Sequence, residues 1–292
     1  MLCFAFLCAA CVKEKQAQIT DRAGNIVVLP ENAKRIISTT PANTEIIVGL
    51  GMQNLLVACD KYSTGIEGVP PGLPLLDMMN PDIEAILSCN PDLLIAHSLN
   101  KVNSSDNPFA VLTNAGISVV YVPMSNSVEG ICEDIRFIAK LLNADERGEE
   151  IILNMQKQID SLRAIAKTID VKRSVYFEIE PAPFMTTLGK ETYLDQIFEI
   201  IGAVNLFGDV KGVVFPSAEE IIVRNPDVMI TNYSYNPNAA LELKSRKGFE
   251  YTNAVKNNAV YLIDANASSR PSQHIIKAIY EIAKCVYPDF YN

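Results

Sequence analysis

The sequence predicts an α/β fold of two Rossmann-like lobes with parallel-rich sheets, joined by one long α-helix. Three observations lead to this prediction. Strand-like and helix-like segments alternate in both halves of the 292-residue chain. The stretch "IEAILSCNPDLLI", which begins at position 83, returns 135 residues later as "AEEIIVRNPDVMI" with six identities. Between the halves, apolar residues recur at steps of three and four, which is the period of a helix.

Composition limits the classes of protein to consider. The chain is 49% hydrophobic and 20% charged, so it can fill a core. Its net charge of −9 argues against a nucleic-acid partner, which would require a basic surface. The longest apolar runs, such as residues 117–122, have the length of a strand and not of a membrane helix.

Residues 1–11, "MLCFAFLCAAC", are apolar and end in small residues before Cys11, and a polar segment follows. This pattern is typical of a bacterial lipoprotein signal and predicts lipidation at Cys11. No Lys or Arg precedes the apolar part, which leaves a start farther upstream open, and Cys8 stands where the motif prefers Leu. A frayed apolar N-terminus is the alternative. We therefore expect an extracytoplasmic protein anchored to the cell membrane by a lipid.

Four further cysteines, Cys59, Cys89, Cys132 and Cys285, show no CxxC or metal-ligand spacing. They are expected to be core thiols, with a Cys59–Cys89 disulfide left open.

Residues 12–34 are interpreted as a linker and an edge strand, and residues 35–142 as the N-terminal lobe. Strands are expected at 27–29, 35–39, 54–60, 93–97 and 117–123. The first helix has Thr40 as its N-cap and Pro41 at its first position, and Gly49 and Gly51 end it. Further helices are expected at 82–88 and 108–115, and 63–74 is a Gly- and Pro-rich loop.

Residues 143–170 are predicted to be the connecting helix. Its core, 144–168, would be about 37 Å long at 1.5 Å per residue. Because it contains no Pro and only one Gly, this helix is predicted to be a rigid connection between the two lobes. The C-terminal lobe, 171–292, repeats the alternation, with strands at 174–179, within 225–232 and at 259–264. Helices are expected at 192–203, 217–223 and 273–286, the second opened by a capping box of Ser217 and Glu220.

The repeated "NPD" can be explained as a common helix-to-strand turn. That explanation does not cover Glu84 and Glu219, each of which lies seven residues before the proline of its lobe. The structural alternative is that each glutamate only stabilises the positive N-terminal end of its own helix, by about 0.3–1 kcal/mol.

Five motifs in order resemble one family: "RIISTTPANTEIIVGLG", "NPDLLIAH", "PAPFMTTLGKETYLDQIFEIIGAVNLF", "NPDVMITN" and "SSRPSQHIIKAI". The chain resembles the substrate-binding proteins of bacterial ABC importers in the class with a long helical backbone. These serve vitamin B12, haem and ferric siderophores. The resemblance covers residue 35 to the C-terminus. It implies a monomer that captures an organic chelate of iron or cobalt between its lobes and delivers it to an ABC permease with its ATPase.

The resemblance also implies roles for residues. Glu84 and Glu219 match the glutamates that dock onto permease arginines, one on each lobe. Tyr62, Phe184 and Phe215 match aromatic positions of the cleft, although the two phenylalanines could equally belong to the core. The chain has no tryptophan, and Leu76 stands about where the family has one.

The remaining candidate ligand-binding residues come from their positions. Arg270 is a candidate for a carboxylate or phosphate, Asn43 lies at a helix N-terminus, and Asn232 and His97 end strands. A structural role is the alternative for Arg270 and His97.

The chain has two histidines, His97 and His274, and no cluster suited to bare zinc or manganese. No metal site and no separate cofactor are therefore expected. If the ligand were haem, Tyr62 or His97 would be the expected axial ligand of its iron.

An α/β enzyme and a non-transport surface lipoprotein are the rival classes. "GLGMQN" ends a helix where a dinucleotide motif would open one, "LGKET" lacks the earlier P-loop glycine, and no GxSxG occurs. No catalytic residue is assigned, and catalysis is not expected.

Overall fold

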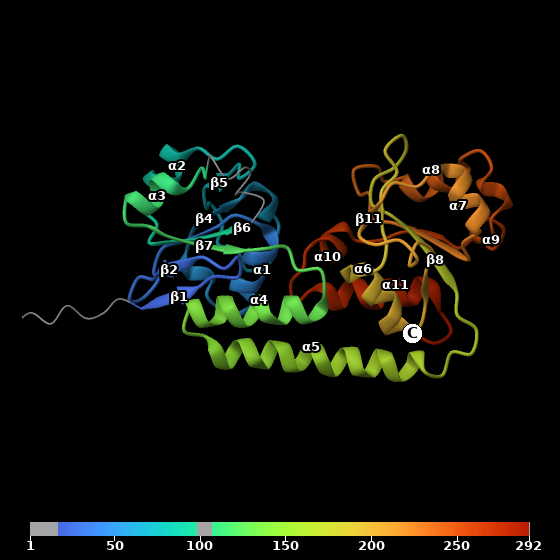
Figure 1. The fold of residues 1–292 in the computed structure, drawn as a ribbon, viewed down its shortest axis with the longest axis horizontal. Helices are drawn as coiled ribbons and strands as arrows, with labels where there is room; N and C mark the ends of the chain where they lie inside the picture. Colours follow the sequence, from blue (N-terminus) through green and yellow to red (C-terminus); the bar gives the residue numbers. More distant parts are fainter. Residues whose placement is uncertain (1–16, 98–106, 292) are drawn as a thin grey trace, which may run out of the picture.

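The computed structural model describes residues 17–97 and 107–291. Two α/β lobes stand side by side, and helix α5 (Asp145–Ala166) runs along the base of both (Figure 1). Each lobe contains a parallel sheet covered by helices. The predicted fold class is therefore confirmed.

The N-terminal lobe is built on a five-stranded sheet in the order β5-β4-β3-β6-β7, with every neighbouring pair parallel. Its central strands are buried on both faces, because helices cover both sides. The strands are β3 (Ile36–Ser38), β4 (Leu56–Asp60), β5 (Leu75–Leu76), β6 (Leu93–His97) and β7 (Ser118–Val122). The helices are α1 (Pro41–Gly49), α2 (Ile83–Ser88), α3 (Ala110–Asn114) and α4 (Val128–Leu141), with 3-10 turns η1 (Gln53–Leu55) and η2 (Lys61–Ser63).

Ahead of this sheet, the segment expected to hold one edge strand forms an antiparallel hairpin of β1 (Gln18–Thr20) and β2 (Ile26–Val28). Helix α4 stands where no element is expected from the sequence. Nine of the fourteen residues of α4 are buried, and they pack against α1 and α5. Thus α4 links the core of the lobe to the connecting helix.

The C-terminal lobe has a four-stranded parallel sheet in the order β10-β8-β12-β13 and a small antiparallel ribbon, β9-β11. The strands are β8 (Ser174–Glu178), β9 (Thr187–Leu188), β10 (Val204–Asn205), β11 (Val213–Val214), β12 (Val228–Thr231) and β13 (Val260–Leu262). The helices are α6 (Tyr193–Ile201), α7 (Ala218–Arg224), α8 (Ala239–Ser245), α9 (Asn253–Lys256), α10 (Ala265–Ser269) and α11 (Ile275–Val286), with a 3-10 turn η4 (Phe249–Tyr251).

Helix α5 has 22 residues, so it is about 33 Å long at 1.5 Å per residue and slightly shorter than predicted. The predicted stripe is its buried face, formed by Ile152, Met155, Ile159 and Leu162. This face packs on α4 of one lobe and on α6 and α11 of the other. One apolar core therefore runs through both lobes along α5.

The repeated "NPD" has the same structural role in both lobes. Asn90 and Asn225 adopt positive φ angles of 46° and 50° after their helices. The carboxylate of Asp92 then accepts the backbone N–H of Lys34 at 2.8 Å, just before β3. The carboxylate of Asp227 accepts the N–H of Ser174 at 3.0 Å, at the start of β8. The shared Asn, Pro and Asp are therefore explained by their position, where a helix passes into one strand and is tied to the strand beside it.

The predicted N-caps of α1 and α7 are present, but one predicted capping interaction is not. Thr40 Oγ1 accepts the N–H of Asn43, and Ser217 Oγ accepts the N–H of Glu220 at 3.1 Å. The capping box at Ser217 is only half formed, because the carboxylate of Glu220 binds Arg224 instead, at 3.1 Å.

Cys59, Cys89, Cys132 and Cys285 are free thiols, so the open possibility of a Cys59–Cys89 disulfide is not realised.

Within residues 17–97 and 107–291, no helix combines the length and apolar character needed to cross a membrane.

Candidate ligand-binding cleft

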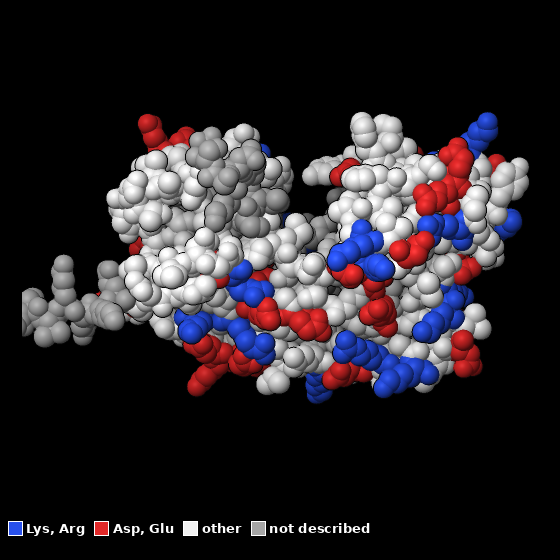
Figure 2. Space-filling model, viewed as in Figure 1, with Lys and Arg blue, Asp and Glu red and all other residues white. Residues whose placement is uncertain are grey.

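A cavity of about 430 Å³ lies between the lobes, and Figure 2 shows the opening on the side away from α5. Its walls come from the last residue of β6 and the segments that follow β3, β4, β5 and β7 in one lobe, and from the segments that follow β8, β12 and β13 in the other. These are the carboxyl ends of parallel strands, where open α/β sheets place their ligands. The parallel order of both sheets therefore positions this cleft.

The N-terminal wall carries Tyr62, Met79, His97 and Met124. Tyr62 stands on the turn η2, which is fixed because the Asp60 carboxylate accepts the Tyr62 N–H at 2.8 Å. Its ring is 53% exposed, and the ammonium of Lys61 lies 5.2 Å from the ring centroid. Tyr62 thus lines the cleft, as the sequence analysis expects.

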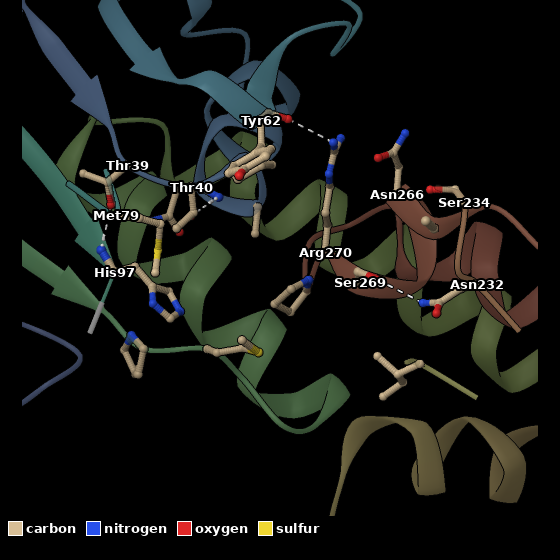
Figure 3. Close-up of a pocket in the computed structure, with 18 of the residues that line it drawn as sticks. Thr39, Thr40, Tyr62, Met79, His97, Asn232, Ser234, Asn266, Ser269 and Arg270 are labelled. Carbon is tan, nitrogen blue, oxygen red and sulfur yellow. Dashed lines mark hydrogen bonds between the residues drawn. The ribbon is translucent and has the colours of Figure 1, made fainter. Parts of the chain in front are cut away.

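His97 ends β6, and its backbone N–H donates to Thr39 Oγ1 at 2.9 Å. Burial lowers the pKa of its imidazole from the ordinary value, which favours the neutral ring. Figure 3 shows Tyr62, Met79 and His97 on the same side of the cavity. A neutral imidazole beside a thioether and a phenol suits contact with an aromatic or metal-bearing ligand.

The C-terminal wall begins with Asn232, directly after β12. Its Nδ2 donates to Ser268 Oγ at 2.9 Å and to Ser269 Oγ at 3.0 Å. These bonds fix the orientation of the amide and leave its oxygen as an acceptor at the cleft. The predicted Asn232 is therefore a lining residue on the opposite wall from Tyr62 (Figure 3).

Two aromatic residues of this wall, Tyr233 and Tyr235, were missed by the sequence analysis. They line the cavity, and their rings meet edge to face at a centroid distance of 5.6 Å. The sequence contains a signal for them, because the tyrosine-containing segment "NYSYNP" directly follows the strand of the second repeat, where cleft residues are expected.

Asn43 also lines the cavity, on α1. The residue is almost fully buried, yet its Nδ2 has no hydrogen-bond partner in the part of the chain that the structure describes. A buried donor without a partner carries a free-energy penalty of about 1–3 kcal/mol. An acceptor on a bound ligand would relieve that penalty, which favours the predicted role of Asn43.

Phe184 and Phe215 are placed differently. Their exposed fractions of 78% and 74% exclude the alternative that they are core residues. Neither lines the cavity. Phe215 follows β11, which lies on the edge of its lobe that faces the other lobe (Figure 1). Their contact with a ligand stays a prediction, and it would have to occur at the rim of the cleft.

Arg270 lies at the base of the cleft, between the lobes. Its Nη1 donates to Glu45 Oε1 at 3.0 Å, and its Nη2 donates to the backbone oxygen of Tyr62 at 3.1 Å. Arg270 lines the cavity, so its contact with a ligand stays a prediction, whereas neither of these two partners is evident from the sequence.

The two repeated glutamates are exposed on the first turns of α2 and α7. Both helices lie on the side of their lobes away from α5 (Figure 1). Across residues 17–97 and 107–291, neither Glu84 nor Glu219 makes an ion pair, whereas the neighbouring Glu220 is paired with Arg224. Nothing in the described fold therefore occupies these two carboxylates. Cys11, the predicted lipidation site, lies outside the described residues.

Comparison with known proteins agrees with this geometry. The family model described as periplasmic binding protein matches residues 36–267. The Bacillus subtilis (strain 168) protein YvrC, named an uncharacterized ABC transporter substrate-binding lipoprotein, is 30% identical over 94% of this chain and 86% of its own length. A vitamin B12-binding protein of Vibrio campbellii is 25% identical over 86% of this chain and 89% of its own.

Among solved structures, a possible iron-binding (periplasmic solute-binding) protein of Staphylococcus epidermidis superposes with a TM-score of 0.79 and 29% identity. The match covers 88% of this chain and all of that one. The chain therefore belongs to the periplasmic binding protein family, and it is a substrate-binding protein and not an enzyme.

Proposed function

We propose that this protein captures an organic chelate of iron or cobalt between its lobes and delivers it to the permease and ATPase of an ABC importer. The observation that carries the proposal is the cleft itself. Aromatic and thioether side chains face one another from two lobes, around a cavity of about 430 Å³. Such surfaces suit a flat, polarisable ligand, because rings stack on them and sulfur contacts ring edges.

The ligand class is a ferric siderophore, haem or a corrinoid. A corrinoid is supported by the relative of Vibrio campbellii that is named for vitamin B12. An iron complex is supported by the similar Staphylococcus epidermidis structure, which is described as possibly iron-binding. His97 and Tyr62 lie on one wall and provide candidate axial ligands for haem iron.

Delivery rests on Glu84 and Glu219. Each presents a carboxylate on a different lobe, on the side away from α5, so a permease with two basic sites would meet both at once. A lipid at Cys11 would hold the protein on the outer face of the membrane, where a monomer can reach the permease.

The test is native mass spectrometry and a visible spectrum of the protein purified from its own host. A Soret band, a corrin spectrum or a ferric-chelate band would each identify one of the three ligands. Protein that leaves its host without any such ligand, and that binds neither hemin, cyanocobalamin nor a ferric siderophore on titration, would contradict the proposal.

A further inference from the structure

The two lobes meet at the base of the cleft in a polar junction built on Glu45 of α1. Arg270 Nη1 donates to Glu45 Oε1 at 3.0 Å, and Ser272 Oγ donates to Oε2 at 2.5 Å. The backbone oxygen of Glu45 accepts Gln273 Nε2 at 2.7 Å. Glu45 belongs to the N-terminal lobe, and its three partners belong to the C-terminal lobe. This junction therefore connects the lobes in addition to α5 and to the hydrogen bonds of Gln196 on α6 with α4.

The junction is closely packed. The side chains of Arg270 and Glu45 are only 16% and 7% exposed. A Cβ atom on Gly49 would lie 2.7 Å from Gln273 Nε2, so a larger residue there would displace the Gln273 side chain from its place against α1. A buried carboxylate that has lost its cation is strongly unfavourable, so Glu45 and Arg270 hold each other in place.

The same guanidinium also holds a cleft residue. Arg270 Nη2 donates to the backbone oxygen of Tyr62 at 3.1 Å, as Figure 3 shows. Tyr62 lies on the short turn η2, so fixing its carbonyl restricts where its ring can stand. Arginine suits this task because its planar group presents several donors in a fixed arrangement, whereas the lysine ammonium is a compact charge on a flexible stem.

We propose that Arg270 is a positioning residue for ligand binding. It acts from the C-terminal lobe through Glu45 and the Tyr62 carbonyl, and it sets the Tyr62 ring at a fixed place opposite Asn232, Tyr233 and Tyr235. Ligand affinity then depends on Arg270 without direct contact between its guanidinium and the ligand. The inference rests on the proposed function only for the choice of ligand probe, because the placement of Tyr62 is measurable without any ligand.

The first experiment reads that placement directly. The chain contains no tryptophan, so Tyr62→Trp in the full-length protein gives a single emitter on the cleft wall. Adding Arg270→Lys should shift the emission to longer wavelength and raise the acrylamide quenching constant. Unchanged emission and quenching in a folded protein would overturn the proposal.

Arg246→Lys is the matched control. Arg246 is 12% exposed and donates to Glu178 at 2.5 Å and to Glu242 at 3.0 Å, all within the C-terminal lobe. It therefore tests the loss of a buried arginine fork away from the junction. We expect lower thermal stability and unchanged emission of Trp at position 62. An equal emission change in this control would mean that the loss of any buried arginine loosens the protein around position 62. That result would contradict the proposal.

The second experiment separates positioning from contact, with hemin and cyanocobalamin as probes. Arg270→Lys should weaken the probe that binds about tenfold, the scale of one lost hydrogen bond to a charged group. In a Tyr62→Ala background the same change should have little further effect, since the residue that Arg270 positions is already gone. Additive effects would mean that Arg270 contacts the ligand itself.

Wild-type protein that binds neither probe would leave a ferric siderophore as the remaining ligand of the proposed function, and the emission of Trp at position 62 would still decide this inference. If Arg270→Lys does not fold, Glu45→Gln replaces it. That change keeps the shape and an acceptor but removes the charge that anchors Arg270, so the same red shift is expected. A Glu45→Gln protein with native emission would overturn the proposal.

Discussion

Reversing the charges of Glu84 and Glu219 together should abolish uptake while leaving ligand binding intact. Both carboxylates are exposed and have no ion-pair partner in residues 17–97 and 107–291, so the exchange to lysine disturbs no described contact. Helices α2 and α7 contribute no side chain to the cleft wall as described. The perturbation therefore leaves the cleft wall unchanged.

The expected size follows from that exposure. An exposed ion pair contributes about 0.2–1 kcal/mol, and reversal replaces attraction by repulsion of similar size, so each site changes the free energy of docking by roughly 0.4–2 kcal/mol. Together the two sites change it by about 0.8–4 kcal/mol, or roughly 4- to 700-fold in affinity. Losing one of two linked contacts also lowers the effective concentration at the other, which adds to the effect.

The assay pairs ligand uptake by cells with calorimetry of the purified variants. Glu146→Lys with Asp170→Lys is the matched control, since it makes the same charge change at exposed positions on α5 and just after it, away from the proposed docking side. Normal uptake by the Glu84 and Glu219 reversal would refute the docking role. Weaker ligand binding in either single variant would show that the reasoning about an outer surface is wrong.

Four further predictions follow. Tyr62→Ala should weaken ligand binding about tenfold, because stacking contributes about 0.5–1.5 kcal/mol beyond burial; unchanged calorimetry in a folded variant would remove Tyr62 from the site. Scattering profiles with and without ligand should nearly overlap, since α5 and the Glu45 junction both hold the lobes; a large contraction would contradict this. Proton NMR should show that the pKa of His97 lies below its ordinary value of 6.5, because the ring is buried. Because the unfolded chain then binds that proton more tightly, stability should decrease as the pH falls below about 6.5, and a His97→Gln variant with an unchanged slope would speak against it. Cys11→Ala should remove the lipid anchor and reduce membrane association; a variant that stays equally membrane-associated and uncleaved would disprove anchoring at Cys11.

The local structure could be predicted from the sequence because it depends on neighbouring residues. Thr40 and Pro41 start α1, and the apolar stripe of 143–170 places α5. The repeat identified two equivalent units, and the structure explains its Asn, Pro and Asp as a turn tied to the adjacent strand. That explanation leaves Glu84 and Glu219 without a structural partner in the described fold, which is the feature that the sequence alone had singled out.

The partners of each site residue were decided by the tertiary structure. Arg270 and Glu45 are 225 residues apart in sequence and belong to different lobes, so no local pattern connects them. Their contact exists because α5 holds the lobes side by side, which brings the C-terminal segment against α1. In the same way, Asn43 becomes a buried donor without a partner among the described residues only once the core has closed around it. The sequence thus determined which elements form, and the packing of two lobes on one helix determined which side chains meet at the cleft.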